Sequence, residues 1–138
     1  MRLSEQQSDF LWMVYELLGF VRQIFFNPAD HFIKDKHLKV TSWTRGPEEQ
    51  KQLVDEGFSW TLNSKHLSGL AADFMIIEKE QAVFESAIYG IMGTYWEDMG
   101  GIWGGNWTGK KKDVFHFEYN LKKRQKFLKE DAKDPFNY

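Results

Sequence analysis

The segment formed by residues 64–73 constrains this chain more than any other part of its sequence. It carries His66 and Asp73, seven positions apart, with Gly69 between them. Imidazole nitrogens and carboxylate oxygens are both good zinc ligands. A glycine lets the backbone turn tightly, so the two side chains can face one ion. The small and apolar residues 71–77 predict a buried strand with Asp73 near its start.

A second group of potential ligands lies downstream, where Asp113, His116 and Glu118 follow one another closely. Taken alone, His66 would be interpreted as a loop histidine, and His116, between two phenylalanines, as a core histidine. The presence of both groups in one chain favours a shared site. Because the chain has no cysteine, a metal would have to be held by His, Asp or Glu.

Length and charge narrow the class of protein. With 138 residues and no linker or repeat, the chain is expected to form one domain over residues 1–138, without a separate second domain. The net charge of −2 gives no electrostatic case for nucleic acid. No apolar stretch is long enough for stable insertion in a membrane, and no signal peptide is expected at the N-terminus.

The order of the predicted elements indicates an α+β domain with a small antiparallel sheet packed against helices and a metal site at the sheet edge. Pro47 and Gly57 mark the start and the end of one helix. The sequence predicts helices from residue 4 to a break at 27–30, over 47–56, over 78–95 and over 121–132, strands over 38–43, 71–77 and 114–119, and loops over 58–63 and 100–109.

Three segments carry a resemblance to a known family. The segment SKHLSGLAAD (64–73) resembles the signature of the D-Ala-D-Ala metallopeptidases, which have the lysostaphin/D-Ala-D-Ala/hedgehog fold. The segment WGGNW (103–107), followed by DVFHFE (113–118), resembles the phage L-alanyl-D-glutamate endolysins of that family. Residues 42–57 resemble the family's segment upstream of the first ligand. The resemblance spans roughly residues 5–120, nearly the whole chain.

The resemblance implies a role for each candidate residue. His66, Asp73 and His116 would hold Zn²⁺, leaving one position open for water, as in catalytic zinc sites. Asp113 would act as general base when a zinc-activated water attacks a peptide carbonyl. Arg45 would stabilise the developing oxyanion or bind a substrate carboxylate. The expected substrate-binding residues are Ser64, Trp103, Asn106 and Trp107, the two tryptophans as walls of the groove.

The spacing of Asp113 and His116 raises a geometric question. Residues three apart on a regular strand point to opposite faces, so Asp113 must precede the strand or a bulge must intervene. Glu118 lies two residues from His116, on the same face, and is the second candidate for the base. Two positions depart from the family pattern, because Asp113 stands where many relatives have Glu, and Phe115 where the phage enzymes commonly have Pro.

The function implied by the resemblance is a zinc peptidase that cuts the stem peptide of bacterial peptidoglycan between L-Ala and D-Glu. Two other classes stay open: a D-Ala-D-Ala carboxypeptidase or dipeptidase, and a non-catalytic module that binds cell-wall peptide or is stabilised by zinc. A phage endolysin without a signal peptide would wait in the host cytoplasm until lysis. A pore-forming holin would then give it access to the periplasm and cell wall.

Overall fold

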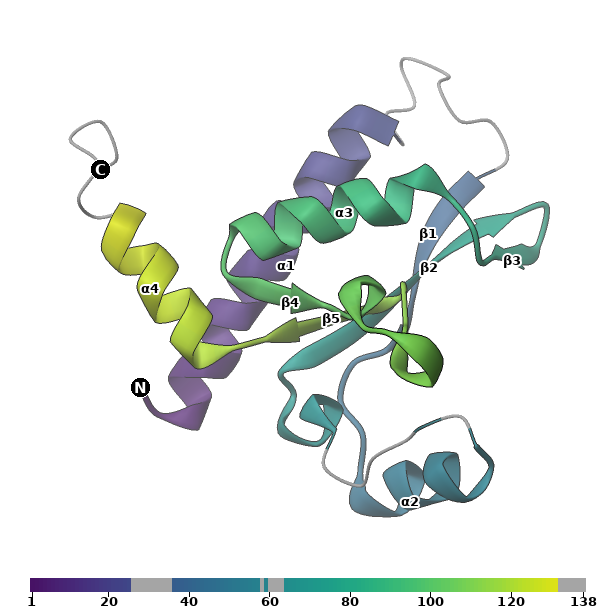
Figure 1. The fold of residues 1–138 in the computed structure, drawn as a ribbon, viewed down its shortest axis with the longest axis horizontal. Helices are drawn as coiled ribbons and strands as arrows, with labels where there is room; N and C mark the ends of the chain where they lie inside the picture. Colours follow the sequence, from purple (N-terminus) through teal and green to yellow (C-terminus); the bar gives the residue numbers. More distant parts are fainter. Residues whose placement is uncertain (26–35, 58, 60–63, 132–138) are drawn as a thin grey trace.

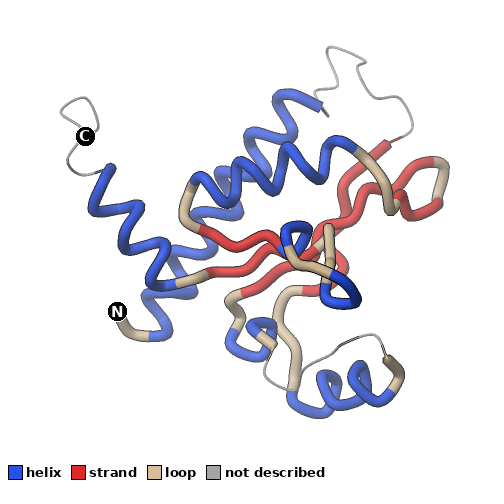
Figure 2. The backbone as a smooth tube through the Cα atoms, in the orientation of Figure 1, coloured by secondary structure: helices blue, strands red, loops and turns tan. Residues whose placement is uncertain are grey.

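The computed structural model describes residues 1–25, 36–57, 59 and 64–131 of the chain. The described part combines helices with one antiparallel sheet, which confirms the predicted α+β class (Figures 1 and 2). The helices are α1 (Leu3–Phe25), α2 (Pro47–Asp55), α3 (Ala87–Asp98) and α4 (Leu121–Asp131), and the strands are β1 (Lys36–Ser42), β2 (Ala71–Glu78), β3 (Gln81–Val83), β4 (Gly101–Trp103) and β5 (His116–Tyr119). Short 3₁₀ turns are η1 (Lys65–Ser68), η2 (Gly104–Asn106) and η3 (Gly109–Lys111).

The sheet has the strand order β1-β2-β5-β4, and β3 forms a hairpin with β2. The strands β2 and β5 are therefore central. Their register places Asp73 directly opposite His116. On its other side β2 pairs with β1, where Ser42 lies opposite Asp73 after a register shift that follows Val40. Residues far apart in the sequence thus meet at one end of the two central strands.

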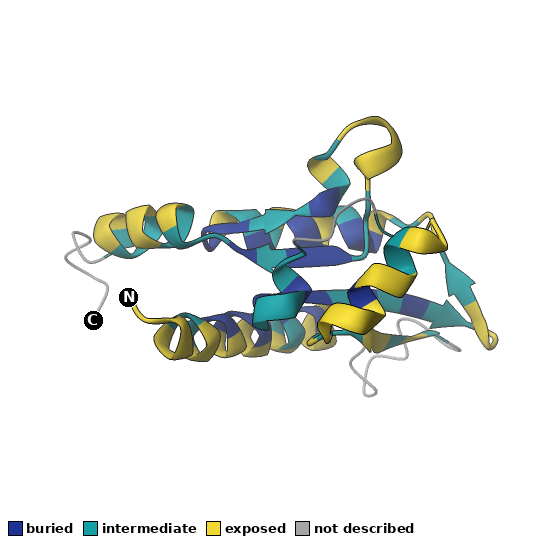
Figure 3. Ribbon diagram, turned by 90° about the horizontal axis from the view of Figure 1, so that it is seen from below, coloured by how far each residue is buried: buried dark blue, intermediate teal, exposed yellow. Residues whose placement is uncertain are grey.

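The two faces of the sheet have different chemistry because side chains alternate along each strand. One face is apolar and packs on the buried faces of α1 and α3, which contact each other (Figure 1). Figure 3 shows α1 exposed on its outer side and buried toward the sheet. The opposite face presents Asp73, His116 and Glu118. The core includes Phe10, Met13, Val14 and Leu17 of α1, Tyr89, Met92 and Trp96 of α3, Phe74 and Ile76 of β2, and Phe117 and Tyr119 of β5.

The predicted helix over residues 78–95 is wrong in its first half. Glu78 ends β2, a two-residue turn follows, and residues 81–83 return as β3. Lys79 and Glu80 both adopt left-handed backbone, with φ of 51° and 64°. Such a turn normally signals itself through Asn or Gly, whereas Lys and Glu are good helix formers. The helix α3 begins later, where the Ser86 side chain accepts a hydrogen bond from the backbone N–H of Ile88.

The glycine-rich stretch 100–109, expected as a loop, contains β4 and the turn η2. The remaining predicted elements are confirmed, with ends shifted by a few residues at most. The predicted break at 27–30 lies outside the described residues, as does the predicted loop at 58–63 except for Ser59. No helix in the described part of the chain has the length and apolarity needed to cross a membrane.

Candidate metal centre and active site

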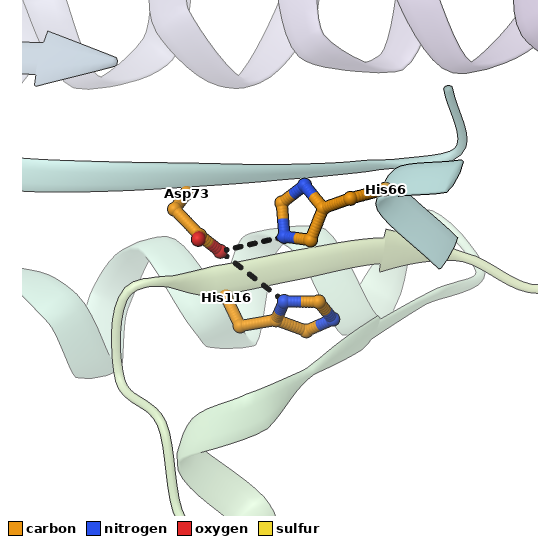
Figure 4. A group of neighbouring side chains, drawn as sticks. All are labelled: His66, Asp73 and His116. Carbon is orange, nitrogen blue, oxygen red and sulfur yellow. Dashed lines mark hydrogen bonds and ion pairs between the residues drawn. The ribbon is translucent and has the colours of Figure 1, made fainter. Parts of the chain in front are cut away.

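His66, Asp73 and His116 point toward one another on the polar face of the sheet (Figure 4). The Oδ1 atom of Asp73 lies 3.2 Å from Nε2 of His66 and 3.2 Å from Nδ1 of His116. One potential ligand atom from each residue lies within 4.8 Å of the other two. Both histidines are buried. The structure therefore brings together the three residues that the sequence suggested as ligands.

Local structure explains how His66 reaches the sheet. The residue lies on η1, whose first backbone turn is capped by Ser64, which accepts a hydrogen bond from the His66 N–H at 3.2 Å. Gly69 ends the turn in left-handed backbone, with φ of 68°. This conformation strongly favours glycine. The turn at Gly69 thus leads directly into β2 and places His66 beside Asp73.

In each histidine, the ring nitrogen that points away from Asp73 has a partner that can only accept a hydrogen bond. Nδ1 of His66 lies 2.7 Å from the carbonyl oxygen of Trp43, and Nε2 of His116 lies 2.8 Å from a carboxylate oxygen of Glu118. These two nitrogens therefore carry the hydrogens. In a neutral imidazole the inward nitrogen then has a lone pair, which faces the carboxylate of Asp73. Three acceptors facing one another require a cation or extra protons between them.

The donor set fits zinc. A tetrahedral ion with bonds of about 2.0–2.1 Å to nitrogen and oxygen requires neighbouring ligand atoms to lie about 3.3 Å apart. The distances from Asp73 Oδ1 to the two histidine nitrogens, both 3.2 Å, are close to that value. The contacts of His66 with Trp43 and of His116 with Glu118 are the outer hydrogen bonds that metal-ligating histidines usually make. The donor types of His66, Asp73 and His116 and these two distances thus fit a zinc ion.

The charges of Asp73 and His116 stabilise each other. Burial by itself would raise the pKa of Asp73, but hydrogen bonds from His116 and His66 lower it to about 2. Burial would likewise lower the pKa of His116, but hydrogen bonds to Asp73 and Glu118 raise it to about 9. In the absence of a metal, a proton on His116 therefore satisfies the carboxylate. A bound cation would take over this function.

Arg45 holds the second oxygen of Asp73. Its Nη2 donates to Asp73 Oδ2 at 3.2 Å, and its Nη1 donates to Gln50 at 2.9 Å. Its Nε donates to Ser42 at 3.0 Å. The side chain is 11% exposed and lines the cavity described below. The guanidinium thus orients the candidate ligand Asp73, and its expected contact with substrate stays a prediction.

Asp113 lies just before β5, which confirms the first of the two geometries considered for it. Its backbone N–H donates to Gly104 at 3.0 Å, and its Oδ1 accepts a hydrogen bond from the Phe115 N–H at 3.0 Å. Burial raises the pKa of the Asp113 carboxyl, and the negative charge of Asp73 raises it further. A carboxylate with a raised pKa is a better general base near neutral pH.

A cavity of about 670 Å³ opens over the cluster. Of the residues expected from the sequence, the three ligands, Arg45, Ser64, Trp107 and Asp113 line it. The ring of Trp107 lies 5.0 Å from that of His116. Sequence reasoning did not place Ser59, Lys65 or the lysines 110–112 there, because polar loop residues are usually interpreted as solvated. The sequence suggested Glu118 as an alternative base. In the structure Glu118 lines the cavity and is hydrogen-bonded to His116.

Trp103 and Asn106 are not among the described residues that line this cavity, so their substrate-binding role stays a prediction. The indole N–H of Trp103 donates to the Val114 carbonyl at 2.8 Å, and the Asn106 amide donates to Glu97 at 3.0 Å. The Trp103 ring packs against Gly93 and Gly105. A Cβ atom on either glycine would lie 2.1 Å from the ring, so a larger residue would clash with it. Trp103 therefore packs behind the loop that carries Asp113.

Comparison with known proteins agrees with this geometry. A family model described as D-alanyl-D-alanine carboxypeptidase matches residues 57–119, which contain all three candidate ligands and Asp113. This match and the solved structure described next support a relation of the chain to the D-Ala-D-Ala metallopeptidase family. The chain is thus a metallopeptidase.

A solved structure of this kind, the L-Ala D-Glu endopeptidase ChiX of Serratia marcescens, aligns with a TM-score of 0.50. The two proteins are 28% identical over 62% of this chain and 68% of the ChiX chain. No curated protein matches the chain.

Gly104 provides a test of how closely the loop must pack for this metallopeptidase to work. A Cβ atom at this position would lie 2.4 Å from the backbone oxygen of Asp113 and 3.0 Å from the Cβ of His116. Gly104→Ala should therefore displace Asp113 and lower kcat by about 10²-fold, the typical effect of a 1 Å misplacement. Gly19→Ala is the control, because Gly19 lies in α1 with nothing near its missing side chain. A Gly104→Ala enzyme with wild-type kcat would refute the close packing.

Proposed function

We propose that the protein is a zinc-dependent peptidoglycan peptidase that cleaves the stem peptide between L-Ala and D-Glu. The observation that carries the proposal is the position of Asp113, a carboxylate with a raised pKa, in the same cavity as the His-Asp-His cluster. A structural zinc site needs no such neighbour. The similarity to a solved L-Ala D-Glu endopeptidase supports the choice of bond.

Each residue has a distinct part in this proposal. Zinc bound by His66, Asp73 and His116 would supply a water of lowered pKa and polarise the peptide carbonyl. Asp113 accepts the proton of the attacking water and passes it to the leaving amine. Arg45 keeps Asp73 oriented through its contact with Oδ2. Asp113 thus carries the proton transfer.

Glu118 is less suited to be the base in this proposal. Its carboxylate already accepts a hydrogen bond from Nε2 of His116, which holds the imidazole with Nδ1 directed at Asp73. A base must be able to reach the attacking water and release its proton again. We therefore assign Glu118 the task of orienting His116.

A second candidate function is a D-Ala-D-Ala carboxypeptidase or dipeptidase. The description of the matching family model favours it. It would use the same cluster and the same base, and would differ only in which end of the stem peptide enters the cavity. A non-catalytic peptide-binding module is disfavoured by Asp113, whose side chain such a module would not require beside the cluster.

The biological setting that we propose is that of a phage endolysin, which the sequence resemblance supports. Such an enzyme is held in the host cytoplasm and acts on the periplasmic cell wall at lysis, with a holin as the partner that opens the membrane. The enzymatic proposal does not depend on this setting.

Digestion of purified peptidoglycan distinguishes the candidates. With added zinc, the wild-type protein should release fragments with new N-terminal D-Glu, identified by mass spectrometry. Release of D-Ala alone would establish the carboxypeptidase instead. Binding to peptidoglycan without any new terminus would establish the non-catalytic module. Treatment with a chelator, followed by readdition of zinc, is the control for metal dependence.

A further inference from the structure

Four lysines line the cavity, although the chain as a whole is slightly acidic. Five cationic side chains line the cavity, against the three carboxylates of Asp73, Asp113 and Glu118. The whole chain has a net charge of −2. The cationic residues that line the cavity are Arg45, Lys65, Lys110, Lys111 and Lys112. We call the last four the lysine rim.

The lysine rim comes from two separate segments that also carry the candidate catalytic residues. Lys65 begins η1 and directly precedes His66. Lys110 and Lys111 lie on η3, and Lys112 directly precedes Asp113. Gly109 starts η3 in left-handed backbone, with φ of 62°. The fold thus presents cationic side chains next to both halves of the site.

Two of the three acidic groups of the cavity are paired with cationic or histidine side chains within it. Asp73 interacts with Arg45 and both histidines, and Glu118 with His116. The side chains at 110–112 are exposed. Once a divalent cation joins the cluster, the positive charge of the cavity increases further. A cavity of this kind attracts anionic groups and repels cationic ones.

We propose that the lysine rim recognises a free carboxylate of the peptide substrate, and so selects stem peptides whose D-Glu carboxyl is free over those in which it is amidated. This inference rests on the proposed function, because D-Glu follows the bond to be cut and keeps one carboxyl group outside the peptide chain. Ammonium groups on flexible stems bind carboxylates without demanding one geometry. An uncharged amide at this position would lose the attraction.

The test compares two synthetic stem peptides, one with the free D-Glu carboxyl and one with that group amidated. Cleavage is measured on the zinc-loaded wild-type enzyme, and affinity is measured by calorimetry on zinc-loaded Asp113→Asn protein. The free acid should bind about tenfold more tightly at low salt, with a matching difference in KM rather than in kcat. The preference should shrink as salt is raised, because exposed charges are screened.

Two variants show whether the lysine rim is responsible. The triple variant Lys110→Gln, Lys111→Gln, Lys112→Gln should lose most of the preference for the free acid. The matched control carries Lys122→Gln, Lys126→Gln and Lys129→Gln in α4, which removes the same charge away from the cavity lining. It should keep the preference. Equal losses of affinity for both peptides in the rim variant would indicate general attraction and overturn the proposal.

The outcomes separate this inference from the proposed function. Cleavage of both peptides with equal affinity would overturn the lysine rim and leave the peptidase intact. Preferential binding of the free acid without cleavage would support the rim and contradict the peptidase. If neither peptide were bound or cleaved, both proposals would be wrong.

Discussion

His116→Ala protein should purify with little zinc and should not cleave peptidoglycan at a measurable rate. The substitution removes Nδ1, one of the three donors that surround the proposed zinc position. It also leaves the partly buried carboxylate of Asp73 with one histidine fewer to balance its charge. Catalytic zinc sites normally use three protein ligands. Elemental analysis of protein prepared without chelator measures the zinc, and mass spectrometry of digested peptidoglycan measures the activity.

His37→Ala is the matched control for this experiment. His37 lies exposed in β1 and outside the cluster, so its removal should change neither zinc content nor cleavage. Circular dichroism should show that the His116→Ala protein keeps its fold, because the apolar face of the sheet is untouched. Stoichiometric zinc in the His116→Ala protein would place the metal elsewhere and contradict the ligand assignment.

Asp113→Asn should slow cleavage by about 10²–10⁴-fold, the usual contribution of general-base catalysis. Asparagine has nearly the same size but cannot take up a proton at neutral pH. Its amide oxygen can still accept the hydrogen bond from the Phe115 N–H, so the turn before β5 should persist. Zinc content should stay near that of the wild type, because His66, Asp73 and His116 remain. The measurement combines kcat with elemental analysis of the same preparation.

Asp73→Asn is the informative comparison, since it changes a candidate ligand and not the base. The neutral side chain should weaken zinc binding and also release the contact with Arg45. Loss of zinc in Asp113→Asn would show that Asp113 is a ligand. Full activity with full zinc would place the base at another residue, and Glu118→Gln would then be the next variant to make.

Local structure and the types of ligand could be predicted from the sequence. The turn from Ser64 to Gly69 and the strand beginning at residue 71 depend on interactions between neighbours in the chain, so a glycine and an apolar run were sufficient to predict them. The absence of cysteine restricted the possible ligands to His, Asp and Glu. The hairpin after Glu78 was missed because Lys79 and Glu80 carry no local signal for their left-handed backbone.

The geometry of the site depends on contacts between distant parts of the chain. Asp73 and His116 meet because of the register between β2 and β5, which depends on packing of the buried face against α1 and α3. The Trp43 carbonyl that faces His66 comes from the residue after β1, 23 positions earlier in the chain. The lysine rim likewise forms where η1 and η3 approach one cavity. Such contacts join residues far apart in the chain, so local propensity and spacing cannot reveal them.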